Sequence, residues 1–171
     1  MTVHLFTHET LAPELATLGT TMHLLAVADD TASAYEAVLV DAEYGDDLVP
    51  HRHPWEECYY VLEGTLDVLV GRRVRPAGPG TFVTLPSRCV HGYRVTTPSA
   101  RFLHLSIGSG AVDAFRDLAA FPPEPTAGDL DALLATLARH GIEVLVDPDA
   151  LRLERPDSTE PVAESAGRPI A

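Results

Sequence analysis

Two histidines and a glutamate lie close together in the segment GDDLVPHRHPWEECYYVLEG, residues 45–64. His51 and His53 are two residues apart, and side chains two apart in a β-strand point to the same side. Glu57 has the same parity, so all three side chains can face one interior. Two imidazoles and a carboxylate on one side form half of a metal-binding shell. The adjacent Glu56 has the wrong parity and is the weaker candidate.

A fourth ligand must come from another strand. His91, in the segment GTFVTLPSRCVHGYRV (80–95), is the natural candidate. Four nitrogen and oxygen donors, with room for water or substrate, suit a divalent Fe, Ni, Mn, Co, Cu or Zn ion and do not choose among them. Such a metal polarises a carbonyl or enolate, or lowers the pKa of a bound hydroxyl or water. Glu57 can also act as a general base towards a substrate hydroxyl.

Several other side chains are candidates for the wall of a small-molecule pocket. Tyr93 follows His91 by two residues and should share its inward face. Packing within a barrel is the competing interpretation for each candidate. The complete set of expected pocket residues is Tyr35, Tyr59, Phe82, Tyr93 and His104.

The segments that carry these residues predict a β-rich domain. Apolar or alternating segments, spaced about ten residues apart and separated by Gly and Pro, are typical of an all-β sandwich or barrel. Glu63-Gly64 is expected to form a tight hairpin turn. The expected strands cover residues 21–28, 34–42, 58–64, 65–71, 80–86, 90–95 and 101–108.

After residue 108 the hydrophobic period becomes helical. Ser109 is a candidate N-cap for a helix with Val112, Phe115 and Leu118 on one face. A second helix is predicted by leucines at i, i+3, i+4 and i+7, with Asp129 as its cap. These leucines are Leu130, Leu133, Leu134 and Leu137.

The chain thus divides into an N-terminal arm (1–20), a barrel (21–108), a helical segment (109–146) and a tail (147–171). Within the arm, Leu11 to Leu18 could form one or two helical turns. The tail is rich in Pro, Glu, Asp, Ser and Arg, and we expect it to be flexible.

Composition argues against several partners and chemistries. A net charge of −13 disfavours nucleic acid and anionic membrane surfaces. All twelve basic residues are arginine, so no lysine chemistry is available. Cys58 and Cys89 are too few for a disulfide scaffold. With neither a signal-peptide pattern nor an apolar run of about eighteen residues, we expect a cytoplasmic protein.

The spacing around the histidines resembles the cupin family. The first cupin motif is a Gly, five residues, His-x-His, three or four residues, Glu, six residues and Gly. The matching positions are Gly45, His51, His53, Glu57 and Gly64. Every specified position of this motif is met.

The second cupin motif is a Gly, five residues, Pro-x-Gly, two residues, His, three residues and Asn. Gly80, Pro86 and His91 match at the right spacing. Arg88 replaces the motif's second Gly, and Val95 replaces its Asn. These departures affect a turn and a structural position and leave the expected ligand in place.

The resemblance implies an all-β fold, the cupin double-stranded β-helix (jelly-roll) barrel, here with two C-terminal α-helices. It implies that His51, His53, Glu57 and His91 hold the metal. Because cupins are commonly dimers, it also implies a homodimer.

The segment HRHPWEECYYVLEG further resembles small one-barrel cupins related to quercetin 2,3-dioxygenase. This implies a metal-dependent dioxygenase acting on an enolisable phenolic or polyketide-like molecule. The alternatives are a non-redox cyclase, isomerase or lyase, and a non-catalytic ligand-binding cupin.

Overall fold

The computed structural model describes residues 14–145, whose strands form two antiparallel sheets. The six-stranded sheet has the order β1-β2-β3-β10-β5-β8, and the five-stranded sheet has the order β11-β4-β9-β6-β7. The six strands of the first sheet are β1 (Glu14–Thr17), β2 (Thr20–Ala26), β3 (Tyr35–Glu43), β10 (Ser99–Ile107), β5 (Glu56–Glu63) and β8 (Phe82–Leu85). The five of the second are β11 (Glu143–Val144), β4 (Asp47–Arg52), β9 (His91–Val95), β6 (Leu66–Val70) and β7 (Arg73–Ala77).

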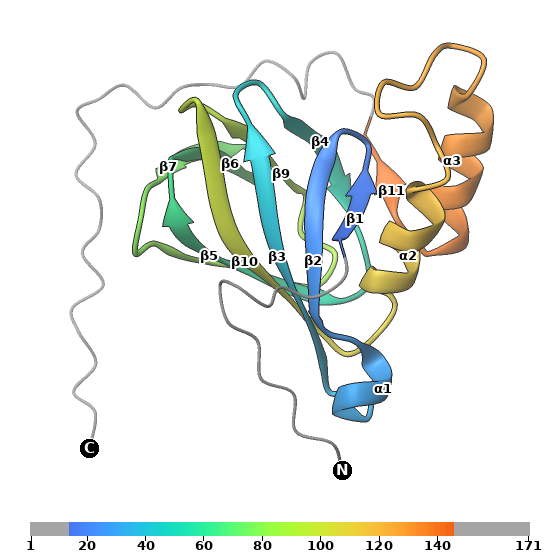
Figure 1. The fold of residues 1–171 in the computed structure, drawn as a ribbon, viewed down its shortest axis with the longest axis horizontal. Helices are drawn as coiled ribbons and strands as arrows, with labels where there is room; N and C mark the ends of the chain where they lie inside the picture. Colours follow the sequence, from blue (N-terminus) through green and yellow to red (C-terminus); the bar gives the residue numbers. More distant parts are fainter. Residues whose placement is uncertain (1–13, 146–171) are drawn as a thin grey trace.

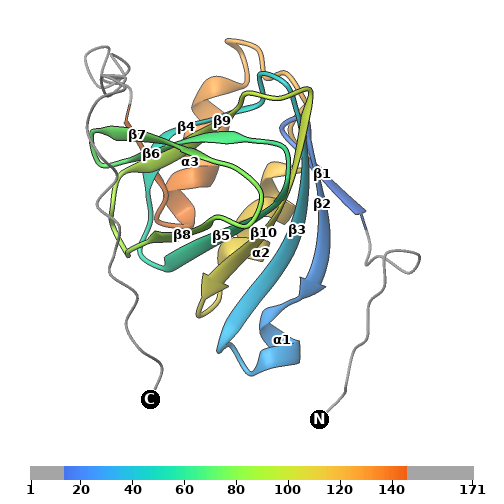
Figure 2. The same cartoon turned by 90° about the vertical axis from the view of Figure 1, so that its left-hand side faces the viewer.

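The two sheets form opposite walls of a barrel (Figure 2). β4, β6, β7 and β9 lie on one side, and β3, β5, β8 and β10 lie on the other. This arrangement confirms the expected jelly-roll. The alternation that predicted the strands has a direct cause: the side chains that alternate inward meet between the sheets. They make a core that includes Val38, Val40, Tyr59, Val61, Leu66, Val68, Val95 and Phe102.

Two helices lie at one side of the barrel (Figure 1). α2 (Ala111–Leu118) and α3 (Leu130–Arg139) contact each other; α2 also contacts β1, and α3 contacts β11. Both helices were expected. The first has Gly110, not Ser109, at its N-cap position. Its N-terminal amides are satisfied from the barrel instead, because the buried Glu36 accepts hydrogen bonds from Ala111 N and Val112 N. A short helix, α1 (Ala28–Thr31), was not expected.

Two local expectations were wrong. The segment expected to form helical turns at Leu11 to Leu18 contains β1, which pairs with β2. Glu63-Gly64 is not a hairpin turn, because β5 and β6 belong to different sheets and the chain crosses between them here. Gly64 has φ 73°, and a Cβ atom there would overlap the carbonyl oxygen of Ser99. The crossing therefore requires glycine.

Residues 1–13 and the predicted tail lie outside the described residues. Among residues 14–145, no helix is both long and apolar enough to cross a membrane.

Candidate metal centre

His51, His53 and His91 come together inside the barrel. One ligand atom from each ring lies within 4.8 Å of the others, and all three side chains are buried. His51 is on β4, His53 directly follows that strand, and His91 begins β9. The antiparallel register of these strands places His51 opposite His91. The three histidines therefore lie together, as the sequence predicted, while their role as ligands stays a prediction.

Each of the three imidazoles is held by a backbone carbonyl two residues away. His51 Nδ1 lies 2.8 Å from Val49 O, His53 Nδ1 lies 3.1 Å from Trp55 O, and His91 Nδ1 lies 2.9 Å from Cys89 O. A carbonyl can only accept, so each Nδ1 is the donor. In the neutral ring the proton is then on Nδ1, and Nε2 carries a lone pair.

The donor set fits a metal cation. His53 Nε2 and His91 Nε2 are 3.1 Å apart, and His53 Nε2 is 2.7 Å from Glu57 Oε2. Lone pairs this close repel one another unless a proton or a cation lies between them. Nδ1 donation to a carbonyl is also the outer contact that orients histidine ligands in metal proteins. A divalent transition metal would satisfy all of these atoms.

Glu57 adds a carboxylate from a separate strand, β5. Its Oε2 also lies 3.8 Å from His91 Nε2, and its Oε1 lies 3.1 Å from His104 Nε2. The single-strand parity argument is therefore only partly right: His51, His53 and Glu57 come from two strands, β4 and β5, and the loop between them. The rival, Glu56, is exposed, as its opposite parity predicts.

The buried ionisable groups of the site shift one another's pKa values. Burial and the charge of His91 lower the pKa of His51 to about 4. Burial opposes ionisation of Glu57, but the charge and hydrogen bond of His104, together with the neighbouring imidazoles of His53 and His91, hold the pKa of Glu57 well below the ordinary value. Burial likewise opposes the charged form of His91, yet Glu57 raises the pKa of that ring. Glu57 is thus an ionised acceptor at neutral pH.

Backbone packing fixes the distance between the two histidine strands. A Cβ atom on Gly92 would overlap the carbonyl oxygen of Leu48, so glycine lets β9 approach β4. The turn before β9 holds the loop after β4: Arg88 N donates to His53 O at 2.8 Å, and Ser87 Oγ donates to Pro54 O at 2.5 Å.

Three of the expected pocket residues point inward. Tyr59 and His104 are buried, and Tyr93 is partly buried. The rings of Tyr59 and Tyr93 are perpendicular, with centroids 6.0 Å apart, and both contact Phe102. Burial and the negative charge of Glu57 raise the pKa of Tyr59, whose hydroxyl has no hydrogen-bond partner among the described residues.

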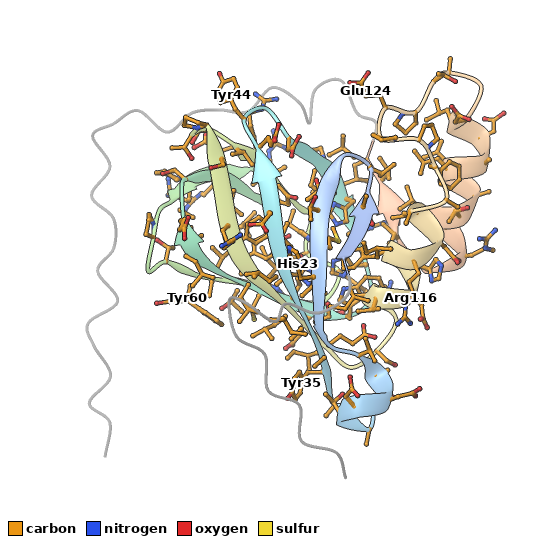
Figure 3. All side chains as sticks on the ribbon, in the orientation of Figure 1. His23, Tyr35, Tyr44, Tyr60, Arg116 and Glu124 are labelled. Carbon is orange, nitrogen blue, oxygen red and sulfur yellow. The ribbon has the colours of Figure 1, made fainter. Side chains whose placement is uncertain are left out.

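Phe82 and Tyr35, the other two expected pocket residues, do not point into the barrel. Phe82 is 58% exposed and Tyr35 is 44% exposed, and Figure 3 shows Tyr35 at the periphery of the ribbon. On β8 the inward position is taken by Leu85, which has the opposite parity to Phe82. On β3 it is taken by Glu36, the residue after Tyr35.

Two neighbours of the site were missed in the sequence. Trp55 stacks on His53 with a centroid distance of 4.1 Å and an interplanar angle of 11°. Its position directly after His53-Pro54 was the available signal. Ser106 is buried opposite Glu57 in the strand register, and its hydroxyl lacks a partner among the described residues. The sequence held no signal for this position, because Ser106 and Glu57 are brought together only by the pairing of β5 with β10.

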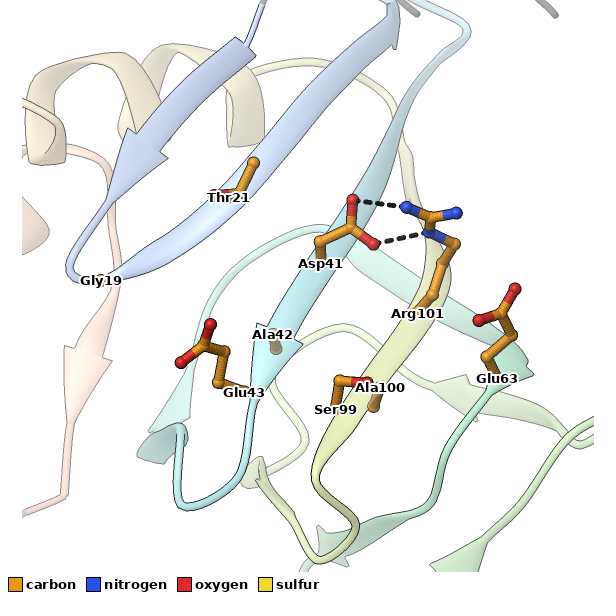
Figure 4. A pocket seen from close by; sticks show the side chains of 9 residues that line it. All are labelled: Gly19, Thr21, Asp41, Ala42, Glu43, Glu63, Ser99, Ala100 and Arg101. Atoms are coloured by element: carbon orange, nitrogen blue, oxygen red, sulfur yellow. Dashed lines mark hydrogen bonds and ion pairs between the residues drawn. The ribbon is translucent and has the colours of Figure 1, made fainter. Parts of the chain in front are cut away.

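A second polar cluster lies away from His51, His53 and His91, at a pocket of about 280 Å³ that Figure 4 shows. Asp41 receives two hydrogen bonds from Arg101, at 2.6 and 3.0 Å, and lies 3.1 Å from His23 Nε2. Burial opposes ionisation of Asp41, but Arg101 and His23 lower its pKa. These pairings already neutralise the carboxylate, so we interpret the cluster as structural.

The fold and the site define a class: a small jelly-roll barrel with three buried histidines at one end that could hold a metal ion. Residues 38–107 match the family profile described as Cupin domain.

The curated relative that matches is quercetin 2,3-dioxygenase of Bacillus subtilis (strain 168), 25% identical over 135 residues. The match covers 74% of this chain but only 40% of the relative.

Solved structures share the fold. KdgF from Halomonas sp. matches with a TM-score of 0.58 and 20% identity, covering 66% of this chain and 99% of that one. The polyketide cyclase RemF from Streptomyces resistomycificus matches with a TM-score of 0.52 and 22% identity, covering 71% and 96%. These similarities establish the architecture of the barrel.

Proposed function

We propose that this protein is a metal-dependent enzyme in which His51, His53, His91 and Glu57 hold a divalent Fe, Ni, Mn, Co, Cu or Zn ion. One observation carries the proposal: three Nε2 lone pairs and a carboxylate converge, while every Nδ1 of the three rings is committed to a carbonyl. When bound, the metal would polarise a carbonyl or enolate and lower the pKa of a bound hydroxyl.

We propose a dioxygenase that acts on an enolisable phenolic or polyketide-like molecule. The sequence similarity to quercetin 2,3-dioxygenase supports this reaction class. Glu57 would take the proton of the substrate hydroxyl, because the carboxylate is ionised and lies beside the metal ligands. Tyr93 is only partly buried and lies two residues after His91, so its ring could pack against an aromatic substrate ring.

The second candidate is a non-redox cyclase, isomerase or lyase. The observation that favours it is the contact between Glu57 and His104, at 3.1 Å. A carboxylate and an imidazole in contact can accept a proton at one point of a substrate and return it at another. Such a reaction needs the metal only as a Lewis acid.

Two measurements separate these candidates. Elemental analysis of the purified protein identifies the metal, and an oxygen electrode records uptake with a flavonol as substrate. A redox metal with oxygen uptake supports the dioxygenase. Zinc, with product formed under anaerobic conditions, supports the non-redox enzyme. Metal and ligand binding without turnover of either kind would favour a binding cupin instead.

We further propose a cytoplasmic homodimer. The two cysteines in the described residues, Cys58 and Cys89, are free thiols, which suits a reducing compartment. Exposed apolar side chains such as Tyr60, Leu62 and Phe82 are available for a subunit contact. Light scattering that gives the monomer mass of 18.4 kDa at every concentration would contradict the dimer.

A further inference from the structure

His104 is a fourth buried histidine near the proposed metal centre and is not one of its three ligand histidines. It lies on β10, directly opposite Tyr59 of β5, and is 5% exposed. Its Nε2 is 3.1 Å from Glu57 Oε1. Its Nδ1 has no hydrogen-bond partner among the described residues. Among the described residues, the polar contact of this ring is therefore with Glu57.

The two oxygens of Glu57 face different groups. Oε2 lies 2.7 Å from His53 Nε2 and 3.8 Å from His91 Nε2, whereas Oε1 lies 3.1 Å from His104 Nε2. A glutamate side chain has several rotatable bonds, so its carboxylate could offer both oxygens to a cation, one, or neither. The contact with His104 selects one of these arrangements. It keeps Oε1 occupied while Oε2 stays at the histidines.

His104 is itself held from outside the barrel. Its ring makes an edge contact with Phe115 of α2, with centroids 5.4 Å apart and an interplanar angle of 68°. The first amides of α2 donate to Glu36 of β3, at 2.9 and 3.1 Å. The imidazole that meets Glu57 is thus fixed by packing as well as by the strand, which is how an outer contact acquires a defined direction.

We propose that His104 is a positioning residue that restricts Glu57 to binding the metal through Oε2 alone. This inference rests on the proposed metal centre, because it assigns a ligand geometry within it. His104 donates Nε2–H to Oε1 and does not coordinate the ion. The remaining coordination positions are then left to water or substrate.

The test is a titration of the metal-free protein with Co²⁺, read by two signals. Trp55 is the one tryptophan of the chain and stacks on His53, so its fluorescence reports binding at that ring. The visible absorption of bound Co²⁺ reports the number and arrangement of its ligands. The variants are His104→Gln, which keeps an N–H donor, and His104→Leu, which removes it. Glu57→Ala and the double variant Glu57→Ala/His104→Leu complete a cycle.

We expect His104→Leu to bind Co²⁺ about 10- to 100-fold more weakly, the usual effect of losing an outer contact, and to change the Co²⁺ absorption spectrum. His104→Gln should retain the wild-type spectrum and affinity. In the Glu57→Ala background the leucine substitution should have no further effect, because His104 acts through Glu57.

Wild-type affinity and spectrum in His104→Leu would overturn the proposal, and so would losses that add in the double variant or appear equally in His104→Gln. If the leucine variant does not fold while the glutamine variant folds and binds normally, the donor requirement is upheld. A wild-type protein that does not bind Co²⁺ would instead overturn the metal centre itself. The two failures are thereby distinguished.

Discussion

The two ends of the barrel interior are built on the same strands but have opposite chemistry. Along β5 the inward side chains are Glu57, Tyr59 and Val61; along β9 they are His91, Tyr93 and Val95. Both strands therefore change from ionisable to aromatic to aliphatic. β10 shows the same gradient, with Ser106 and His104 at one end and Phe102 and Ala100 at the other.

This gradient separates stability from chemistry. The aliphatic end gains free energy by removing apolar surface from water. The ionisable end loses hydration, which is unfavourable unless each polar atom finds a partner. Unpartnered buried atoms of Tyr59, Ser106 and His104 lie on the polar and aromatic part of these strands. We therefore expect the polar end to depend on a ligand and the apolar end to hold the fold.

Substitutions at each end of the barrel test this comparison, and the largest expected effect is on metal binding at the polar end. His53→Ala removes one Nε2 from the group of three, so stoichiometric metal binding should be lost while the fold persists. The measurement is metal content after dialysis, with circular dichroism as the check on folding. His23→Ala is the matched control, since His23 is also buried but contacts Asp41 away from the site. One equivalent of metal retained by His53→Ala would disprove the ligand assignment.

At the other end the effect should be on stability. Phe102 is 1% exposed and contacts both Tyr59 and Tyr93. Phe102→Ala should lower the free energy of unfolding by about 3–5 kcal/mol, through lost burial and a cavity. Phe82→Ala is the control, because Phe82 is 58% exposed and its truncation should cost about 0.5 kcal/mol or less. Urea denaturation compares the two. Equal losses would show that the inner and outer faces contribute alike.

The sequence predicted the site better than it predicted the surroundings. Motif spacing identified the three histidines and Glu57 because ligand positions are tied to strand ends and short loops. It could not show that Glu57 contacts His104, since they are distant in sequence and meet only through the β5–β10 register. Arg88, which departs from the motif's glycine, still adopts φ 61°, so the turn keeps its shape.

The phase of a strand was the weaker part of the prediction. Tyr93 and Glu57 each lie an even number of residues from a histidine expected to face inward, so parity placed them inward as well. Phe82 and Tyr35 have no such histidine on their own strands, so parity could not tell which way they point. A register shift also occurs in β4, between Leu48 and His51, and it resets which side chains face inward. Pairing of β11 with β4 depends on a two-residue strand, too short for any periodic signal.

Acid should weaken the metal-free fold through the polar end. The folded-state pKa of His51 is about 4, below the ordinary 6.5, so the unfolded chain binds its proton first as pH falls. The free energy of unfolding should decrease between pH 6.5 and 4 by up to about 1.4 kcal/mol per pH unit. His91 acts in the opposite sense: its raised pKa gives stability that is full below the unfolded pKa and is lost as pH rises through the folded pKa.

Glu57 extends the acid effect, because its lowered pKa gives stability that is present above the ordinary 4.5 and disappears at lower pH. Urea denaturation at several pH values, in the presence of a chelator, measures the slope. His51→Ala should remove the component between pH 6.5 and 4. An unchanged slope in that variant would assign the acid effect to other groups.

The smallest expected effect concerns the backbone that joins the two histidine strands. Gly92 has no room for a Cβ atom beside Leu48 O, whereas a Cβ atom on Gly78 would meet only Thr65 Oγ1, at 3.9 Å. Gly92→Ala should therefore lower the free energy of unfolding by about 1–3 kcal/mol, as overpacking does. Gly78→Ala should raise it by about 0.4–1 kcal/mol, because alanine restricts the unfolded chain.

Metal affinity distinguishes a local from a general effect of this substitution. Because Gly92 follows His91, pushing β9 away from β4 should separate His91 from His51 and weaken metal binding about 10-fold or more. Gly78→Ala should leave metal binding unchanged, since Gly78 lies beyond β7. Urea denaturation and metal titration of both variants provide the comparison. If Gly92→Ala stabilised the protein as Gly78→Ala does, close approach of the strands would not be what brings the histidines together.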